Sequence, residues 1–481
     1  MSQEWPGLEG SEWFNGKSSS ENYDEAREYL DNWIEETVEH GSTEWDSPRY
    51  AYYYITPLVL LRDFIADTTL RRRCEMMLEL TLVDYAADYL NGSYCGAHSR
   101  DGDGAVIDPR KAEVTSYGQL YFTDSIDFVL PDLAYAAMSA WQCPSIIRAI
   151  AHDRERTFVH TEAKRSRAKM RFSTERYTTA IRYNYMTPDY CLGSVSSGVH
   201  QPIQQHSWDI TFAANHPTNT LFALHPTWSA RELGTFFPEE PDLMVAGVAR
   251  AKASYTNENK WIGASPHEFV AQDSNVLVAV YDIPDSDVVQ HVDVFISKWF
   301  DSVNVNPSGW IFARMDNALV AMRVYADSTT LITESAGLRL RVWPGKANEL
   351  FDNASPTTGA IVIVCQSTTD MTFGEFVNAM TDPYSIKRPW TPPQVMAGSA
   401  VSISNGAGVE RTFFWRGRER GLVPRAASLA LTFNGPHVAS FSSTREPVPS
   451  GITMRFDGHA RTLDFRSASV IESQEGQSVS R

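Results

Sequence analysis

The chain has 481 residues, of which 43% are hydrophobic and 21% are charged, and its formal net charge is -17 at pH 7. This length exceeds what one hydrophobic core usually serves, so we expect two domains. The acidic balance disfavours nucleic-acid binding, which requires many Lys and Arg side chains to neutralise phosphates. A local basic cleft that binds an anionic sugar remains compatible with it.

The five cysteines are odd in number and widely spaced, and they form no zinc-binding pattern. The N-terminal segment lacks the apolar core of a signal peptide, and no apolar run is long enough to span a membrane. We therefore expect a protein without membrane contact. It would be cytoplasmic, or a mature secreted or periplasmic form that has lost its signal.

Residues 1–155 are predicted to form a helical domain. Apolar side chains recur at helical spacing over Glu21–His40. The segment Tyr50–Ala66 is strongly apolar, and Pro57 inside it is expected to kink or divide the helix. Thr68–Leu90 is a third predicted helix. The short turns between these segments predict antiparallel helical hairpins.

The pattern changes between residues 150 and 175, across the basic connector Arg154–Arg171. From Phe172 onward, short runs rich in Val, Ile, Thr, Phe and Tyr alternate with Gly, Pro, Asn and Asp clusters. Successive strands without long helices between them indicate antiparallel sheets packed as a sandwich. The predicted fold class is α+β, with helical hairpins followed by a large antiparallel β-sandwich over residues 172–470.

A first candidate site is the turn Glu44-Trp45-Asp46-Ser47-Pro48-Arg49-Tyr50, which we call the Glu44–Tyr50 turn. A carboxylate, an indole and a phenol in one turn suit a sugar, because sugar faces stack on aromatic rings. Asn22, at the start of the first predicted helix, is grouped with it. The alternative is a capping turn in which Trp45 packs as a hydrophobic staple.

A second candidate is the glycine-rich segment from residue 92 to 104, which we call the 92–104 loop. It carries His98, which can exchange protons near neutral pH, and Arg100, which can bind a carboxylate with two hydrogen bonds. Asp101-Gly-Asp103-Gly104 is similar to a short calcium loop, although it lacks the bidentate Glu of an EF-hand. A structural calcium site and a solvated turn are therefore the two alternatives to a catalytic role for this loop. An even number of antiparallel helical passes separates this loop from the Glu44–Tyr50 turn, which predicts that both lie at the same end of the helical domain.

The third candidate is the polar and aromatic stretch that contains Tyr185, Tyr190 and the segment around His206. Strand alternation predicts His206 and Trp208 on one face and Gln205 on the other. We expect His206 to face the helical domain across a shared cleft. The alternative is a buried histidine with satisfied hydrogen bonds.

This organisation resembles the chondroitin AC/alginate lyase superfamily, including the heparinase II/III-like proteins, which join a toroid of helix pairs to layered β-sheets. The Glu44–Tyr50 turn resembles the Glu-x-x-Ser-Pro-x-Tyr turns of toroid proteins. The segment Gln205–Phe212 resembles the His-containing first strands of the heparinase-like β domain. Residues 1–155 suffice for only part of a toroid.

The resemblance implies β-elimination at a uronic acid, without a cofactor, and an acidic poly- or oligosaccharide as partner. One residue must neutralise the carboxylate, a base must take the α-proton, and an acid must protonate the leaving oxygen. Arg100 and Asn22 are the candidates for neutralisation. The candidates for proton transfer are His98 or His206 as base and Tyr190 or Tyr185 as acid. The candidates for sugar binding are Glu44, Trp45, Gln205 and Trp208.

Two other functions fit the same residues. A glycoside hydrolase would use a carboxylate pair, for example Glu44 with Asp46 or Asp101. A non-catalytic carbohydrate-binding protein would use Trp and Tyr stacking alone.

Overall fold

The structure is a computed structural model. It describes residues 12–102, 104–123, 133–168, 173, 175–176, 178–195, 200, 206–227, 257, 259–344, 358–382, 390–396, 400–405, 410–414, 431–442, 449–474 and 477–480. Within these residues, no helix is both long enough and apolar enough to cross a membrane.

Helices dominate the first part of the chain. They are α1 (Ser19–His40), α2 (Tyr50–Phe64), α3 (Thr68–Ala87), the 3-10 turn η1 (Pro109–Lys111), α4 (Thr115–Phe122), α5 (Leu133–Met138) and α6 (Ser145–His152). Ser18 and Glu21 form a capping box at the start of α1, in which each side chain accepts from the other residue's backbone N–H. Helix α2 contains Pro57 and continues to Phe64, so of the two expected outcomes, a kink or a division, the division does not occur.

The change from helices to strands falls within the predicted interval, residues 150 to 175. Helix α6 ends at His152, and the first long strand, β3, begins at Phe158. The strands therefore start inside the basic connector, before Phe172. A two-stranded hairpin, β1 (Tyr89–Leu90) and β2 (Ser93–Tyr94), lies earlier, directly after α3.

A 14-stranded sheet crosses the whole molecule, in the order β14-β15-β10-β7-β6-β5-β4-β3-β20-β21-β22-β23-β24-β25. Every strand pairing in it is antiparallel. Its strands are β3 (Phe158–Lys164), β4 (Ala180–Met186), β5 (Tyr190–Val195), β6 (Trp208–Phe212), β7 (Thr220–Leu224), β10 (Val292–Ser297), β14 (Ser328–Thr333), β15 (Gly337–Trp343), β20 (Thr432–Asn434), β21 (Val438–Ser442), β22 (Pro449–Phe456), β23 (His459–Asp464), β24 (Ser469–Gln474) and β25 (Gln477–Ser480).

A second sheet packs on one half of the large sheet and forms the predicted sandwich. Its six strands, in sheet order, are β11 (Ser302–Val305), β12 (Trp310–Met315), β13 (Ala318–Tyr325), β16 (Thr358–Ser367), β9 (Val276–Asp282) and β8 (Glu268–Asp273). Buried side chains of both sheets, such as Leu192, Ile210 and Val320, share one apolar cluster. Helix α10 (Phe373–Thr381) covers the outer face of the six-stranded sheet. A three-stranded sheet consists of β17 (Trp390–Met396), β18 (Ala400–Asn405) and β19 (Glu410–Phe414).

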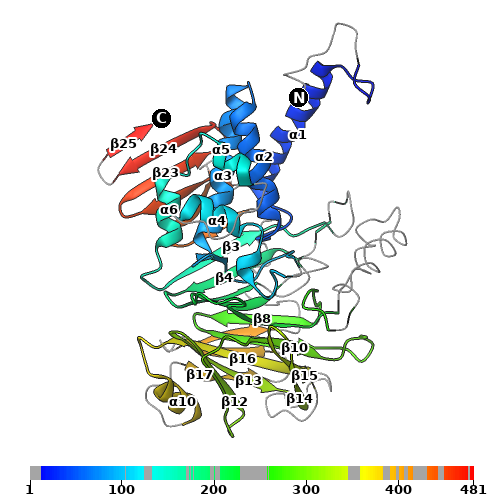
Figure 1. The fold of residues 1–481 in the computed structure, drawn as a ribbon, viewed down its shortest axis with the longest axis vertical. Coiled ribbons are helices and arrows are strands. Elements are labelled where there is room, and N and C mark those ends of the chain that lie inside the picture. Colours follow the sequence, from blue (N-terminus) through cyan, green and yellow to red (C-terminus); the bar gives the residue numbers. More distant parts are fainter. Residues whose placement is uncertain are drawn as a thin grey trace.

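The helices cover the other half of the large sheet. Phe433, Ile452 and Leu463, from the C-terminal strands, share an apolar cluster with the helices, and these strands lie beside α3 and α6 (Figure 1). Arg461 on β23 reinforces the contact by donating two hydrogen bonds, at 2.6 and 2.7 Å, to Glu79 of α3. The end of the predicted sandwich range therefore belongs to the helical core. The α+β class is confirmed, but one sheet serves both cores.

Candidate functional site

The helices and the large sheet meet at a network of buried charges, which we call the charge network: Asp46, Asp84, Asp88, Glu162, Lys164 and Arg182. Lys164 of β3 bonds both oxygens of Asp84, at 2.7 and 2.8 Å, and also pairs with Asp46. Arg182 of the neighbouring strand β4 lies 2.5 Å from Asp88 and 3.2 Å from Asp46. Each cation thus joins carboxylates of the helical part to the sheet.

Local structure explains why these charges meet. Side chains of β3 and β4 alternate between buried and half-buried, which directs Glu162, Lys164 and Arg182 toward the helices. Asp84 lies in the last turn of α3 and Asp88 is its C-cap, where the helix dipole disfavours negative charge. The cations offset this cost. Burial alone would raise the pKa of Glu162, but Lys164 and Arg182 hold that pKa well below its usual range.

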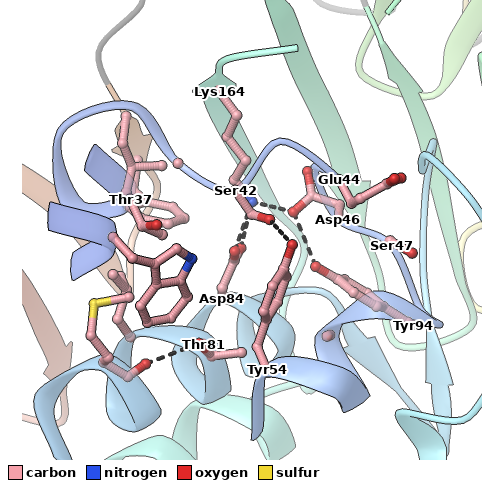
Figure 2. A pocket seen from close by; sticks show the side chains of 17 residues that line it. Thr37, Ser42, Glu44, Asp46, Ser47, Tyr54, Thr81, Asp84, Tyr94 and Lys164 are labelled. Atoms are coloured by element: carbon pink, nitrogen blue, oxygen red, sulfur yellow. Dashed lines mark hydrogen bonds and ion pairs between the residues drawn. The ribbon is translucent and has the colours of Figure 1, made fainter. Parts of the chain in front are cut away.

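A pocket opens beside the network, between α1, α2 and α3 (Figure 2). Its polar lining includes Ser42, Glu44, Asp46, Tyr54, Asp84, Tyr94 and Lys164. Ser42 donates to the Tyr54 hydroxyl at 2.8 Å, and Tyr94 donates to Asp46 at 3.1 Å. Trp33 lies beside Tyr54, with 6.0 Å between the ring centroids, and supplies an aromatic wall. Burial raises the pKa of Tyr54 to about 12. We call this space the junction pocket.

Two arginines converge on Glu44 of the pocket lining. Arg167 Nη2 lies 2.7 Å from Glu44 Oε1, and Arg100 Nε lies 3.9 Å from the same oxygen. Arg100 also donates to the Tyr50 hydroxyl at 3.0 Å. Glu44 is buried, while both guanidinium groups keep partial exposure, at 17% for Arg100 and 14% for Arg167. The arrangement combines positive charge, a carboxylate and phenols at one point.

The Glu44–Tyr50 turn and the 92–104 loop lie at the same end of the helices, as predicted. Ser99 N donates to Trp45 O at 3.3 Å, and the Ser47 hydroxyl donates to the carbonyl of Arg100. These contacts bring Arg100 to Glu44. The even number of helical passes was therefore the right basis for the prediction.

His98 and His206 also meet, and His206 faces the helical part as expected. Their backbones form an isolated antiparallel bridge, and their ring centroids are 4.5 Å apart. Both rings are buried, however, and burial lowers the pKa of each to about 3. Asp209 adjoins them, and burial raises its pKa to about 6. His206 is therefore neutral near neutral pH, and its ring stacks on Phe222.

The predicted pairing of His206 with Trp208 on one strand face is wrong. Asp209 pairs with Phe222, against which the His206 ring stacks, so His206 lies on the face toward the helices. Ser207 and Trp208 both turn to the sandwich side, where Ser207 bonds Glu268. Two consecutive residues therefore share a face, and the strand alternation breaks just before β6.

The large sheet also separates the other predicted site residues. Tyr190 and Trp208 are buried in the sandwich core, and Tyr185 packs against that core. These three side chains lie on the sheet face away from Arg100 and His98, so one site cannot include both sets. Their predicted roles in acid catalysis and sugar binding have no geometric support.

The remaining predicted residues lie apart from the pocket. Trp45 is fully buried against Ala97 and Val195, which favours the packing alternative over sugar stacking. Asn22 bonds Ser18 O near the start of α1, roughly 27 Å along the helix from its C-terminal end at 1.5 Å per residue. Gln205 lies outside the described residues.

The structure does not test the predicted calcium loop, because Asp103 falls outside the described residues. Asp101 is buried and accepts from Gly102 N at 2.6 Å. Burial raises its pKa to about 7. Asp101 also does not line the junction pocket with Glu44. The carboxylates that do line it with Glu44 are Asp46 and Asp84.

Several residues of the site were missed in the sequence. Asp84, Lys164, Arg167 and Arg182 carry most of the charge there, but two of them fall in the basic connector and resemble solvated residues. One signal was present: Arg182 and Asn184 alternate with Ile181 and Tyr183, so one face of a predicted strand is polar. The polar face of that strand is buried along its whole length, and a buried charge needs a partner.

Comparison of the chain with protein-family models, with curated proteins and with solved structures finds no match. The site must therefore be interpreted from its own chemistry.

Replacing Lys164 with Met should destabilise the protein by about 3–5 kcal/mol, because Asp84 would lose its buried counter-ion and Asp46 would keep only Arg182. Urea unfolding measures the change. The control Lys111→Met removes a side chain that is 69% exposed and should alter stability by about 1 kcal/mol or less. Equal effects of the two changes would contradict the burial argument.

A pH dependence follows from the sandwich core. Glu268 accepts from Tyr281 at 2.8 Å, and burial raises its pKa from 4.5 to about 7. The folded state therefore binds a proton between these pH values that the unfolded state releases, and stability falls as pH rises through this window. Glu268→Gln removes the effect, so its stability relative to the parent should increase by up to about 3 kcal/mol from pH 4.5 to 7 and then stay constant.

Thermal or urea unfolding across this pH range measures the difference. Glu25→Gln, a change at a surface side chain that is 62% exposed, is the control and should show no such trend. A difference between Glu268→Gln and the parent that stays flat across the range would show that Glu268 is ionised throughout.

Proposed function

We propose that the protein is a carbohydrate-active enzyme that cleaves a uronic-acid-containing glycan by β-elimination at Glu44, where the junction pocket adjoins Arg100 and Arg167. One observation carries this proposal: Arg100 and Arg167 converge on Glu44, beside the phenols of Tyr50 and Tyr54. The helical hairpins would then form part of a toroid that opens toward the sheet.

The arginines have the chemistry to bind the uronate. A guanidinium group can hold a carboxylate with two parallel hydrogen bonds, and two such groups attract a second anion beside Glu44. Neutralising the uronate carboxylate makes its α-proton more acidic. The developing negative charge would then be stabilised by positive groups that are already in place.

Proton transfer falls to the groups that line the pocket. Glu44 would take the α-proton, the bond to the glycosidic oxygen would break, and a carbon–carbon double bond would form. Tyr54 is the proposed acid for the leaving oxygen, because a pKa of about 12 keeps its hydroxyl protonated near neutral pH. Trp33 could stack on a sugar ring next to the reacting one. In this proposal His98 and His206 take no part.

A glycoside hydrolase is the second candidate, because Glu44, Asp46 and Asp84 all line the pocket. Asp46 and Asp84 are both held by the ammonium group of Lys164, which is itself buried. Glu44 differs in that its partners are two arginines, which can also bind the uronate carboxylate, and this favours elimination over hydrolysis.

The direct test is incubation of the protein with a panel of uronic-acid polysaccharides. A lyase produces an unsaturated uronic acid, so ultraviolet absorbance should rise together with the number of reducing ends. New reducing ends without absorbance would establish the hydrolase instead. Binding of a glycan without either product would reject both enzymes.

Replacing Arg100 with Met should lower turnover by about 10²-fold or more, the typical effect of removing one preorganised donor. Arg156→Met, at a side chain that is 62% exposed and pairs with Asp153, should leave turnover unchanged. Initial rates per folded molecule, with thermal unfolding as the check on folding, give the comparison. Full activity of a folded Arg100→Met variant would remove Arg100 from the site.

A further inference from the structure

We propose that His98, His206 and Asp209 bind one divalent transition-metal ion, with Zn²⁺ as the best fit, between the 92–104 loop and β6. The nitrogen and oxygen atoms that these residues can offer lie within 4.8 Å of one another. Ligand atoms around a tetrahedral zinc are roughly 3.4 Å apart at bond lengths of 2.0–2.2 Å, so a small closure of side chains would bring three of the four ligands into place, and a water molecule would be the fourth.

The hydrogen bonding of His98 resembles that of a metal ligand. Its Nδ1 lies 3.0 Å from the carbonyl oxygen of Ser99 and can donate to it. This contact fixes the tautomer in which Nε2 carries the lone pair. Metal-bound histidines characteristically make such a bond with their second nitrogen. The ring is also held in place by the backbone bridge between His98 and His206.

His206 supplies the strongest observation. Its side chain is buried, yet neither Nδ1 nor Nε2 has a hydrogen-bond partner within the part of the chain that the structure describes. Its Nδ1 lies 3.9 Å from Asp209 Oδ2, and the other oxygen of Asp209 also lacks a hydrogen bond there. Buried polar atoms almost always have partners, and a metal ion would serve all three residues.

A buried histidine elsewhere in the sheet provides the contrast. His225 lies at the end of β7, with Nδ1 2.7 Å from Ser265 Oγ and Nε2 2.8 Å from the carbonyl oxygen of Val289. Both of its nitrogens are satisfied by protein atoms. The fold therefore provides partners for a buried imidazole where no ion is needed, and it does not do so at His206.

The donor set selects the class of ion. Two imidazoles and one carboxylate suit zinc and related transition metals, whereas calcium and magnesium prefer oxygen ligands alone. The three residues are only 2–7% exposed, so the ion would have little contact with solvent. Its role would be structural: it would fasten the loop that carries Arg100 to the sheet. This proposal does not rest on the lyase activity.

The test starts from the full chain, purified without a polyhistidine tag and dialysed against metal-free buffer. Elemental analysis by mass spectrometry should find about one zinc per chain. After chelation, added Zn²⁺ should raise the melting temperature, and added Co²⁺ should produce visible absorption bands. X-ray absorption at the zinc edge should show two imidazole ligands. A folded chain that holds no zinc and takes up neither ion would overturn the proposal.

Variants locate the ion. His206→Ala and the isosteric Asp209→Asn should weaken Co²⁺ and Zn²⁺ binding by at least about 100-fold, since loss of a supporting residue alone costs 10–100-fold. His216→Ala, which removes a histidine that stacks on Trp299 outside the cluster, should bind as the parent does. Unchanged binding by folded Asp209→Asn and His206→Ala would place the ion elsewhere. If both variants misfold, the count of imidazole ligands in the parent still decides.

Discussion

The pairing of Lys164 and Arg182 with carboxylates of the helical part is the interaction on which the structure depends. A buried charge without a partner is strongly destabilising, so α3 and the Glu44–Tyr50 turn can occupy only the position in which these carboxylates reach the two cations. Apolar packing of helices on β20–β24 would tolerate small shifts, because hydrophobic contacts are not directional. The charge network removes that freedom and thereby defines the junction pocket.

The large sheet divides the chemistry of the molecule between its two faces. The face toward the helices carries charged and titratable side chains, among them Lys164, Arg182 and His206. The opposite face carries Tyr190 and Trp208 and packs against the six-stranded sheet. A ligand bound at Arg100 and Glu44 would therefore contact only the first face. Among the described residues, the apolar core of the sandwich lies behind the large sheet and lines no part of the junction pocket.

Much of the architecture was predictable, because period and turn chemistry are local properties of the sequence. The change from helices to strands and the common end shared by Arg100 and Glu44 both followed from such patterns. The sequence did not predict which elements pack against each face of the large sheet. The alternation of strand residues predicted that Trp208 and Tyr190 are buried, but not in which of the two cores. The break in alternation at Ser207 placed His206 on the opposite face from Trp208, and not on the same face as predicted. Lys164 resembled a solvated residue because its carboxylate partner Asp84 is distant in sequence.

The central claim is that the charge network makes the helices and the large sheet one cooperative unit, and native-state hydrogen exchange tests it most directly. Amides of α3 and of β3–β4 should exchange through the same opening event, with equal free energies and equal denaturant dependence. In Lys164→Met the two sets should separate, with α3 opening at lower free energy than β4. Independent opening of α3 in the unaltered protein would contradict the account.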